Sequence, residues 1–133
     1  MRDLIKTFKA LSDESRMRVL SLLLERECCV CEVMQAIDIS QSKASRILSA
    51  LYDAGILKLR KDGRWSLYSI ERGGMAEHLV YVVEAVAKAL EGNPSAAQDR
   101  ERLRKAERLG PGCVQETRGA KPGRLVSWPL SQG

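Results

Sequence analysis

Apolar residues recur every three or four positions through most of the first 92 residues, which is the spacing of helices with one buried face. In the first such run, Leu4, Phe8 and Leu11 share a face. Ser12 and Ser40 stand just ahead of later runs, where they suit helix N-caps. The pattern predicts helices over residues 3–11, 13–25, 31–37, 41–54 and 75–91. The third and fourth of these, joined by a tight connection, are typical of a helix-turn-helix.

An alternation of apolar and polar residues, the period of a strand, follows at residues 57–59 and 65–70. Between these segments lies Asp62-Gly63, a favoured two-residue hairpin turn. A hairpin directly after a helix-turn-helix forms a wing, so we predict a mainly α fold with a small β-hairpin, a winged helix-turn-helix. The last predicted helix carries Leu79 and Val83 on one side and Tyr81 on another. We therefore expect it to bury one side against a second copy, which gives a homodimer.

The composition becomes polar after residue 92. Residues 96–109 predict a charged helix without a continuous apolar face, and Gly and Pro recur from residue 110. We therefore predict two parts of the chain. Residues 1–92 form a winged helix-turn-helix domain for DNA binding and dimerisation. Residues 93–133 form a polar basic tail, partly helical or disordered, that supplies no core.

A local excess of positive charge accompanies the predicted helix-turn-helix and hairpin. The chain has a net charge of +5, and residues 40–64 hold six Lys and Arg against two Asp. This excess indicates double-stranded operator DNA as the partner, although a solvated face can carry the same charge. Hydroxyls, Gln and Arg on the second helix suit base edges in the major groove, and hairpin cations suit phosphates. The predicted DNA-binding residues are Ser40, Gln41, Ser42, Lys43, Ser45, Arg46, Ser49, Arg60, Lys61 and Arg64.

Three of the four cysteines cluster at Cys28, Cys29 and Cys31, and the fourth is Cys113. No apolar run is long enough for a membrane span, and the first residues lack the apolar stretch of a signal peptide. We therefore expect a cytoplasmic protein with no membrane partner. In a reducing cytoplasm, clustered cysteines indicate metal binding or redox chemistry more than a disulfide framework. We expect no enzyme, because the sequence has no phosphate-binding glycine loop, no Cys-x-x-Cys and no alternation of strands with helices.

Four segments resemble the ArsR/SmtB family of metal-responsive winged-helix repressors, in the same order along the chain. They are residues 8–16 (FKALSDESR), 39–48 (ISQSKASRIL), 54–57 (AGIL) and 63–68 (GRWSLY). The resemblance covers residues 1–92. It implies a dimer held by the first and last helices, and binding to an inverted repeat near the promoter that the protein controls.

The sequence around Cys29 and Cys31 resembles the metal box of this family, at the start of the helix before the recognition helix. In the arsenite-sensing branch, Cys-Val-Cys is followed after two further residues by a third Cys, where this chain has Met34. The resemblance implies Cys29 and Cys31 as ligands and arsenite or antimonite as the inducer, with no permanently bound cofactor. We infer that Cys28 is the third thiol, with Cys113 as its rival.

Helical geometry predicts that ion binding distorts the start of the helix. Residues two apart in a regular helix point about 200° apart, so we expect Cys29 and Cys31 to share one ion only if the first turn unwinds. Such unwinding would carry ion binding to the recognition helix.

Other interpretations of the cysteines stay open: a disulfide-forming redox sensor of the same fold, a sensor of cadmium or lead, or a DNA binder whose buried cysteines are silent. Cadmium and lead sensors of the resembled family share Cys-Val-Cys but take further thiols from an N-terminal extension that this sequence lacks. Zinc or nickel sensing in the last helix needs several histidines, and the sequence has one, His78.

Overall fold

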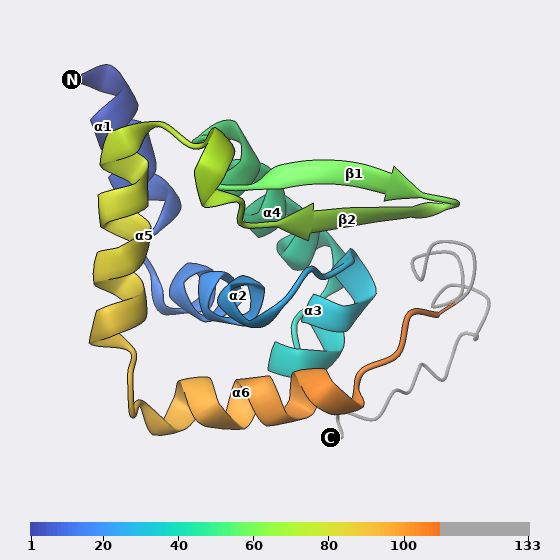
Figure 1. Ribbon diagram of the computed structural model, residues 1–133. Helices are drawn as coiled ribbons and strands as arrows, with labels where there is room; N and C mark the ends of the chain where they lie inside the picture. Colours follow the sequence, from blue (N-terminus) through green and yellow to red (C-terminus); the bar gives the residue numbers. More distant parts are fainter. Residues whose placement is uncertain (110–133) are drawn as a thin grey trace.

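The structure is a computed structural model, and it describes residues 1–109 of the 133-residue chain. A hairpin projects on one side of the central helices, and further helices stand on the other side (Figure 1). The elements are α1 (Arg2–Ala10), α2 (Glu14–Glu25), α3 (Val30–Ile37), α4 (Gln41–Asp53), β1 (Lys58–Asp62), β2 (Trp65–Ser69), a 3-10 turn η1 (Arg72–Gly74), α5 (Glu77–Ala89) and α6 (Pro94–Lys105). The predicted mainly α fold with a small hairpin is confirmed.

The predicted recognition helix, α4, forms where the sequence places it. Ser40 is its N-cap, and the Ser40 hydroxyl accepts the backbone N–H of Lys43 at 3.1 Å. Its buried residues are Ala44, Ile47, Leu48 and Leu51. These four lie three or four apart, so they make one apolar face against the core and leave the opposite face to solvent.

The N-cap of α2 is Asp13, and the prediction of Ser12 is wrong. The Asp13 carboxylate accepts the backbone N–H of Arg16 at 2.9 Å, whereas the Ser12 hydroxyl donates to the Lys9 carbonyl at the end of α1. A carboxylate accepts this bond more strongly than a hydroxyl and also suits the positive end of the helix dipole. Ser12 is thus left to satisfy a carbonyl of the preceding helix.

The wing is the antiparallel pair β1–β2, in which Lys58 faces Ser69 and Asp62 faces Trp65. Gly63, in the turn, has a φ of +64°, a conformation that glycine adopts without strain. Cys28 extends this sheet on the free edge of β2 through an isolated bridge to Tyr68. The segment between α2 and α3 is therefore fastened to the wing.

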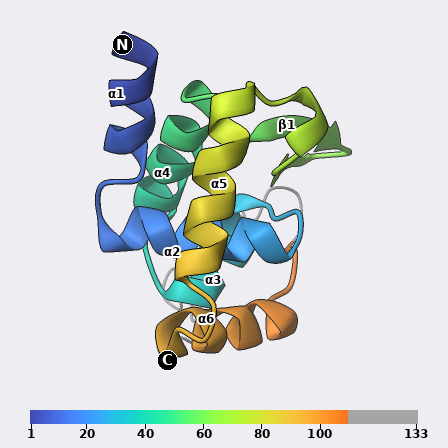
Figure 2. The ribbon, with the colours of Figure 1, turned by 60° about the vertical axis from the view of Figure 1, so that its left-hand side comes forward.

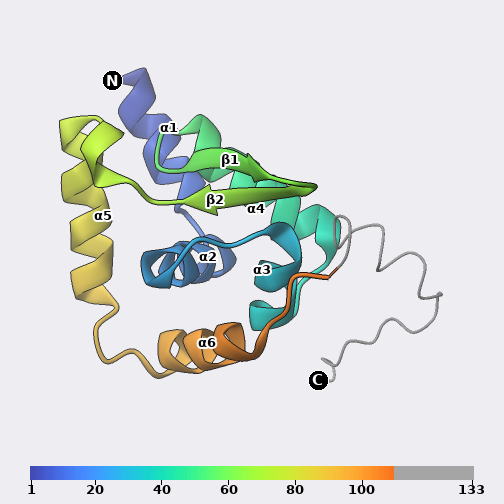
Figure 3. The same ribbon diagram turned by 45° about the vertical axis from the view of Figure 1, so that its right-hand side comes forward.

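The helix α6 packs beneath α2 and α3 (Figures 1 and 3), and the expectation that the tail supplies no core is wrong. Leu103 is completely buried in the core, and Ala96 is 3% exposed. Sequence reasoning underestimated α6 because its apolar face is narrow, with charged residues between the few buried positions. The domain boundary at residue 92 stays a prediction.

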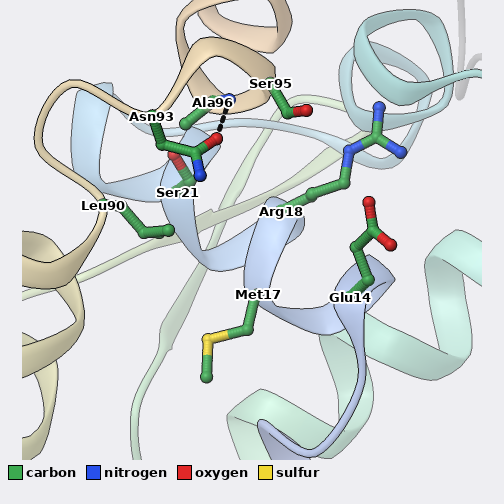
Figure 4. A pocket seen from close by; sticks show the side chains of 8 residues that line it. All are labelled: Glu14, Met17, Arg18, Ser21, Leu90, Asn93, Ser95 and Ala96. Carbon is green, nitrogen blue, oxygen red and sulfur yellow. Dashed lines mark hydrogen bonds between the residues drawn. The ribbon is translucent and has the colours of Figure 1, made fainter.

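The N-terminus of α6 is fixed to α2 by polar contacts. The Asn93 side chain caps α6 by accepting the N–H of Ala96 at 3.0 Å (Figure 4). The Arg18 guanidinium forms two hydrogen bonds, each 2.8 Å, with the carboxylate of Asp99, which is 1% exposed. Between α2 and this end of α6 lies a small cavity of about 200 Å³, which Met17 helps to line. We call residues 94–109 the C-terminal arm.

The helices α1 and α5 stand on the side of the molecule away from the tip of the wing (Figures 1 and 2). Among the residues that the structure describes, no helix is long and apolar enough to cross a membrane.

Candidate DNA-reading surface and thiol site

The solvent face of α4 carries most of the predicted base-reading residues. Ser42, Lys43, Arg46 and Ser49 are exposed, while Gln41 and Ser45 are half-buried. The Gln41 amide donates to the Ser45 hydroxyl at 2.9 Å. Most of these side chains are short, so the helix can approach base edges closely in a major groove, where the Arg46 guanidinium can reach a base.

The three predicted wing cations are all exposed, but they differ in their partners. Lys61 donates to the Ser66 hydroxyl at 2.9 Å. Arg60 forms two hydrogen bonds with the Glu27 carboxylate, at 2.7 and 2.9 Å. The structure thus places one predicted phosphate contact, Arg60, in an ion pair with the segment that bears the cysteines.

The sulfur atoms of Cys29 and Cys31 lie 3.4 Å apart. Cys29 is the N-cap of α3 and has an extended backbone, with φ −96° and ψ 173°, so the helix begins only at Val30. The N-cap side chain folds back over the first turn, where it meets Cys31. The expectation that the first turn must unwind to bring the two sulfurs together is therefore wrong.

Cys28 differs from this pair in its surroundings. Its backbone N–H and carbonyl bond to Tyr68 at 3.0 and 2.8 Å, and its sulfur contacts the Arg26 carbonyl at 3.4 Å. Within residues 1–109, no group of three or more His, Cys, Asp or Glu is placed to hold a metal ion. The rival ligand Cys113 lies outside the described residues.

Burial raises the pKa of two thiols. The pKa of Cys28 rises to about 12, mainly because the side chain is removed from water and secondly because the Glu32 carboxylate is near. Burial likewise raises the pKa of Cys29 to about 11, against the opposing effect of a backbone hydrogen bond from Glu32. Both thiols are therefore protonated at neutral pH in the ion-free protein, although the helix N-terminus by itself favours thiolate.

Glu32 is a buried carboxylate, 3% exposed, at the centre of the thiol site. It accepts hydrogen bonds from the Cys29 backbone N–H at 2.9 Å, from Arg26 at 3.0 Å and from Arg108 at 3.1 Å. With Cys29 it also completes a capping box at the start of α3. Two arginines compensate the buried charge, one beside α3 and one from the C-terminal arm.

The end of the C-terminal arm lies across α3 and reaches the wing. The Gln35 amide donates to the Glu107 carbonyl at 2.7 Å and accepts the Glu107 N–H at 3.2 Å. The Glu107 carbonyl also lies 3.6 Å from the Cys31 sulfur. The Trp65 indole donates to the Leu109 carbonyl at 3.0 Å. The arm therefore joins the thiol site to the wing.

Sequence reasoning missed Arg108 as a part of this site, and it assigned no hydrogen-bond partners to Glu27 and Glu32. The spacing of Cys29 and Glu32 matches a capping box with cysteine in the place of serine, and that signal is present in the sequence. No signal in the sequence pairs Arg108 with a residue 76 positions earlier.

Comparison with known proteins agrees with this fold. The profile described as "Bacterial regulatory protein, arsR family" matches residues 13–58, from the start of α2 to the start of β1. The chain is 32% identical over 93 residues to an uncharacterized HTH-type transcriptional regulator, Rv0081, of Mycobacterium tuberculosis, and covers 82% of it. A crystal structure of Rv0081 superposes with a TM-score of 0.53 at 31% identity, covering 65% of this chain and 84% of that one.

The chain belongs to the arsR family of bacterial regulatory proteins. This family and this fold are those of DNA-binding transcriptional regulators with a winged helix-turn-helix, and not of enzymes. The predicted resemblance to this family is confirmed.

Two further relatives are named for resistance to toxic ions. A cadmium resistance transcriptional regulatory protein, the CadC homolog of Staphylococcus aureus, is 42% identical over 83 residues, 62% of this chain and 65% of its own length. The arsenical resistance operon repressor of Escherichia coli is 45% identical over 67 residues, 50% of this chain and 57% of its own length. The chain thus spans between half and two thirds of these two relatives. A structure from Mycobacterium bovis, described as a homodimeric winged helix-turn-helix domain, shares the fold at 24% identity, with a TM-score of 0.57 over 70% of this chain and 82% of that one.

Proposed function

We propose that this protein is a transcriptional repressor that leaves its operator DNA when a thiol-seeking ion binds Cys29 and Cys31. Trivalent arsenic, as arsenite, is the first candidate ion, and antimonite the second. The observation that carries the proposal is the pair of sulfur atoms 3.4 Å apart at the start of α3. Cys31 is disulfide-bonded in this structure, so the proposal concerns the reduced protein, in which Cys31 is a thiol. The names of the arsenic and cadmium resistance relatives support the class of ion.

The distance between the two sulfurs suits a shared ion. Two sulfurs, each at a metal–sulfur length of about 2.3 Å, lie about 3.8 Å apart at a tetrahedral angle and about 3.3 Å apart at a right angle. The observed 3.4 Å falls between these values and nearer the right angle. Both sulfurs can therefore bind one ion of either geometry without a large movement.

The third thiol remains a choice between two residues. Cys28 is our predicted third ligand, and it adjoins Cys29 in sequence. Its sulfur contacts the Arg26 carbonyl, and its backbone is bound to Tyr68, so it would have to turn toward the pair. Cys113 is six residues beyond Glu107, whose carbonyl lies 3.6 Å from the Cys31 sulfur. Six residues span at most about 20 Å, so Cys113 is within reach of the pair.

We further propose that the protein acts as a homodimer through α1 and α5. Between these helices and α2 lies an apolar groove of about 520 Å³, lined by Phe8, Leu11, Ser12, Met17, Tyr81, Val82, Ala85 and Val86. Tyr81 is 69% exposed and Phe8 is 53% exposed. Large apolar side chains gathered on one face of a monomer mark an interaction surface. A twofold axis through this face would present two copies of α4 to successive major grooves.

The test is DNA binding measured against a panel of ions. A duplex selected from a random library by the ion-free protein serves as the operator. We expect arsenite to weaken operator binding about 5- to 150-fold, the usual range of allosteric coupling. Cys29→Ser and Cys31→Ser should each bind the operator as the natural chain does and no longer respond. Retention of the arsenite response in both variants would disprove the proposal.

Two more variants identify the third thiol. If Cys28→Ser abolishes the response and Cys113→Ser does not, Cys28 is the third ligand, and the reverse result assigns Cys113. Release by an oxidant in place of arsenite would make the protein a redox sensor of the same fold. Release of the operator by cadmium or lead, and not by arsenite, would change the proposed inducer but not the proposed binding site.

Sedimentation at micromolar concentration tests the dimer, and Tyr81→Asp should convert it to a monomer. A natural chain that is a stable monomer would disprove this part.

A further inference from the structure

The segment that carries the cysteines is fastened to the wing at two successive residues. Cys28 exchanges both backbone hydrogen bonds with Tyr68 of β2. Glu27 holds Arg60 of β1 through a bidentate ion pair, with distances of 2.7 and 2.9 Å. Cys29, one of the two proposed ion ligands, is the next residue in the chain. A movement of the thiol site can therefore pass directly to the wing through these contacts.

Arg60 is also one of the cations predicted to contact DNA phosphate. A guanidinium binds a carboxylate and a phosphate with the same fork of N–H donors, so a DNA phosphate and Glu27 compete for it. Glu27 competes as an anion, because a glutamate carboxyl that is paired with an arginine is ionised at neutral pH. A carboxylate that stayed on Arg60 would also stand near the DNA backbone and repel it.

We propose that Glu27 competes with DNA phosphate for Arg60, and that an ion on Cys29 and Cys31 favours Glu27 in this competition by fixing the segment before α3. The first half concerns the ion-free protein alone, and the second half rests on the proposed function. Glu27 is thus a positioning residue, which acts on DNA through Arg60.

The direction of the effect follows from the connections of the segment. DNA binding through Arg60 requires the guanidinium to leave Glu27, or the segment at residues 27–29 to move aside. An ion bound to Cys29 and Cys31 ties this segment to the rigid start of α3, and the Cys28 bridge already ties it to β2. The ion-bound protein therefore keeps Glu27 against Arg60, and Arg60 no longer neutralises a phosphate. By linkage, DNA that draws Arg60 away must weaken ion binding by the same factor.

The first experiment uses the full chain without ions and a duplex of random sequence. Glu27→Gln should tighten binding about two- to fivefold, the range for release of a surface ion pair. Arg60→Ala should weaken binding and flatten the dependence of log affinity on log salt by about 0.9 for each phosphate that Arg60 neutralises in the natural chain. In the Arg60→Ala background, Glu27→Gln should bring no gain, because its effect passes through Arg60.

Glu25→Gln is the matched control. It removes the same charge two residues earlier, but Glu25 pairs with Arg100 and Arg104 of α6 and not with the wing. We expect it to change DNA affinity by less than about twofold, since screening weakens distant surface charges. A gain from Glu27→Gln that persists without Arg60, or that Glu25→Gln reproduces, would overturn the first half.

The second experiment adds arsenite to the operator complex. In the natural chain, arsenite should flatten the dependence of log affinity on log salt by about 0.9 for each Arg60 that no longer neutralises a DNA phosphate. In Glu27→Gln the salt dependence should stay the same with and without arsenite, and the loss of affinity should shrink at least about twofold. An unchanged arsenite response in Glu27→Gln would overturn the second half. A natural chain that ignores arsenite would instead disprove the proposed inducer, while the ion-free cycle still decides whether Glu27 competes for Arg60.

Discussion

On the DNA-reading surface, side chains of α4 and the wing face solvent and hold few partners, whereas in the thiol site Glu32 and the cysteine sulfurs are buried among partners from three parts of the chain. Arg46 on α4 is exposed, but Glu32 in the thiol site is 3% exposed and bonds to Arg26, Arg108 and the backbone of Cys29. Side chains in the first region can therefore contact DNA without giving up many existing contacts. The second is preorganised, so a change at one residue there reaches the others.

Loss of α6 packing should damage the thiol site most. Leu103→Ala should lower the free energy of unfolding by about 4 kcal/mol, because it leaves a cavity in the core and loosens the arm that holds Glu32. Urea unfolding followed by circular dichroism measures this loss. Leu59→Ala, on the half-exposed wing, is the matched control and should cost less than about 1 kcal/mol. Removal of residues 93–133 should destabilise the protein further, and a truncated chain of natural stability would show that the arm is dispensable.

Glu32→Ala should lower the free energy of unfolding by about 3 kcal/mol. It removes the charge that pairs with Arg26 and Arg108, and it leaves the Cys29 N–H without its acceptor. Both arginines are about one third exposed and can turn to water, which keeps the loss at the lower end for a broken buried pair. Glu101→Ala, on the exposed face of α6, should change stability by less than about 0.5 kcal/mol. Equal effects of the two substitutions would contradict a structural role for Glu32.

On the DNA-reading surface, Arg46→Ala should leave stability unchanged and reduce operator affinity. We expect a loss of about 2 kcal/mol for the operator and a smaller loss for random duplex, because a base contact is specific. Lys61→Ala should instead weaken both complexes and flatten the salt dependence by about 0.9. Fluorescence anisotropy at several salt concentrations separates the two patterns. Equal losses on operator and random DNA would remove Arg46 from the base-reading residues.

Because the thiols are buried and their pKa is raised, ion binding at the thiol site should depend on pH. Cys29, with a pKa of about 11, is protonated at neutral pH, so Cd²⁺ must expel its proton. The apparent cadmium affinity should therefore rise with pH by about tenfold, or 1.4 kcal/mol, per pH unit for each proton released. Arsenous acid is different, because its hydroxyl groups leave as water with the thiol protons and no net proton is released. Calorimetry across the neutral range measures both, and a flat cadmium profile would mean that the thiols are already ionised.

The outline of the DNA-reading surface could be predicted because its determinants are local. The spacing of Ala44, Ile47, Leu48 and Leu51 defines the buried face of α4, and Ser40 caps the helix by contacting a residue three positions away. The turn at Gly63 likewise needs only adjacent residues to form the wing. The residues left over on the outward face are then the ones that can meet DNA. Their roles as individual contacts stay predictions.

The thiol site could be predicted in its residue types but not in its arrangement. The cluster at Cys28, Cys29 and Cys31 is plain in the sequence, and so is its suitability for a soft ion. Helical geometry applied to Cys29 led to the wrong expectation of unwinding, because the helix begins one residue later than the cysteine. A shift of one residue at a helix end is within the uncertainty of any interpretation of sequence periodicity.

By itself, the sequence determined the helix-turn-helix, the wing, the position of the cysteines and the surplus of positive charge beside them. Tertiary structure alone decided that Arg60 is held by Glu27, that Glu32 lies between two arginines, and that Leu103 enters the core. The physical reason is sequence separation. Periodicity and capping act within a few residues, whereas these contacts join positions 6 to 76 residues apart, and their partners meet only after the helices have packed.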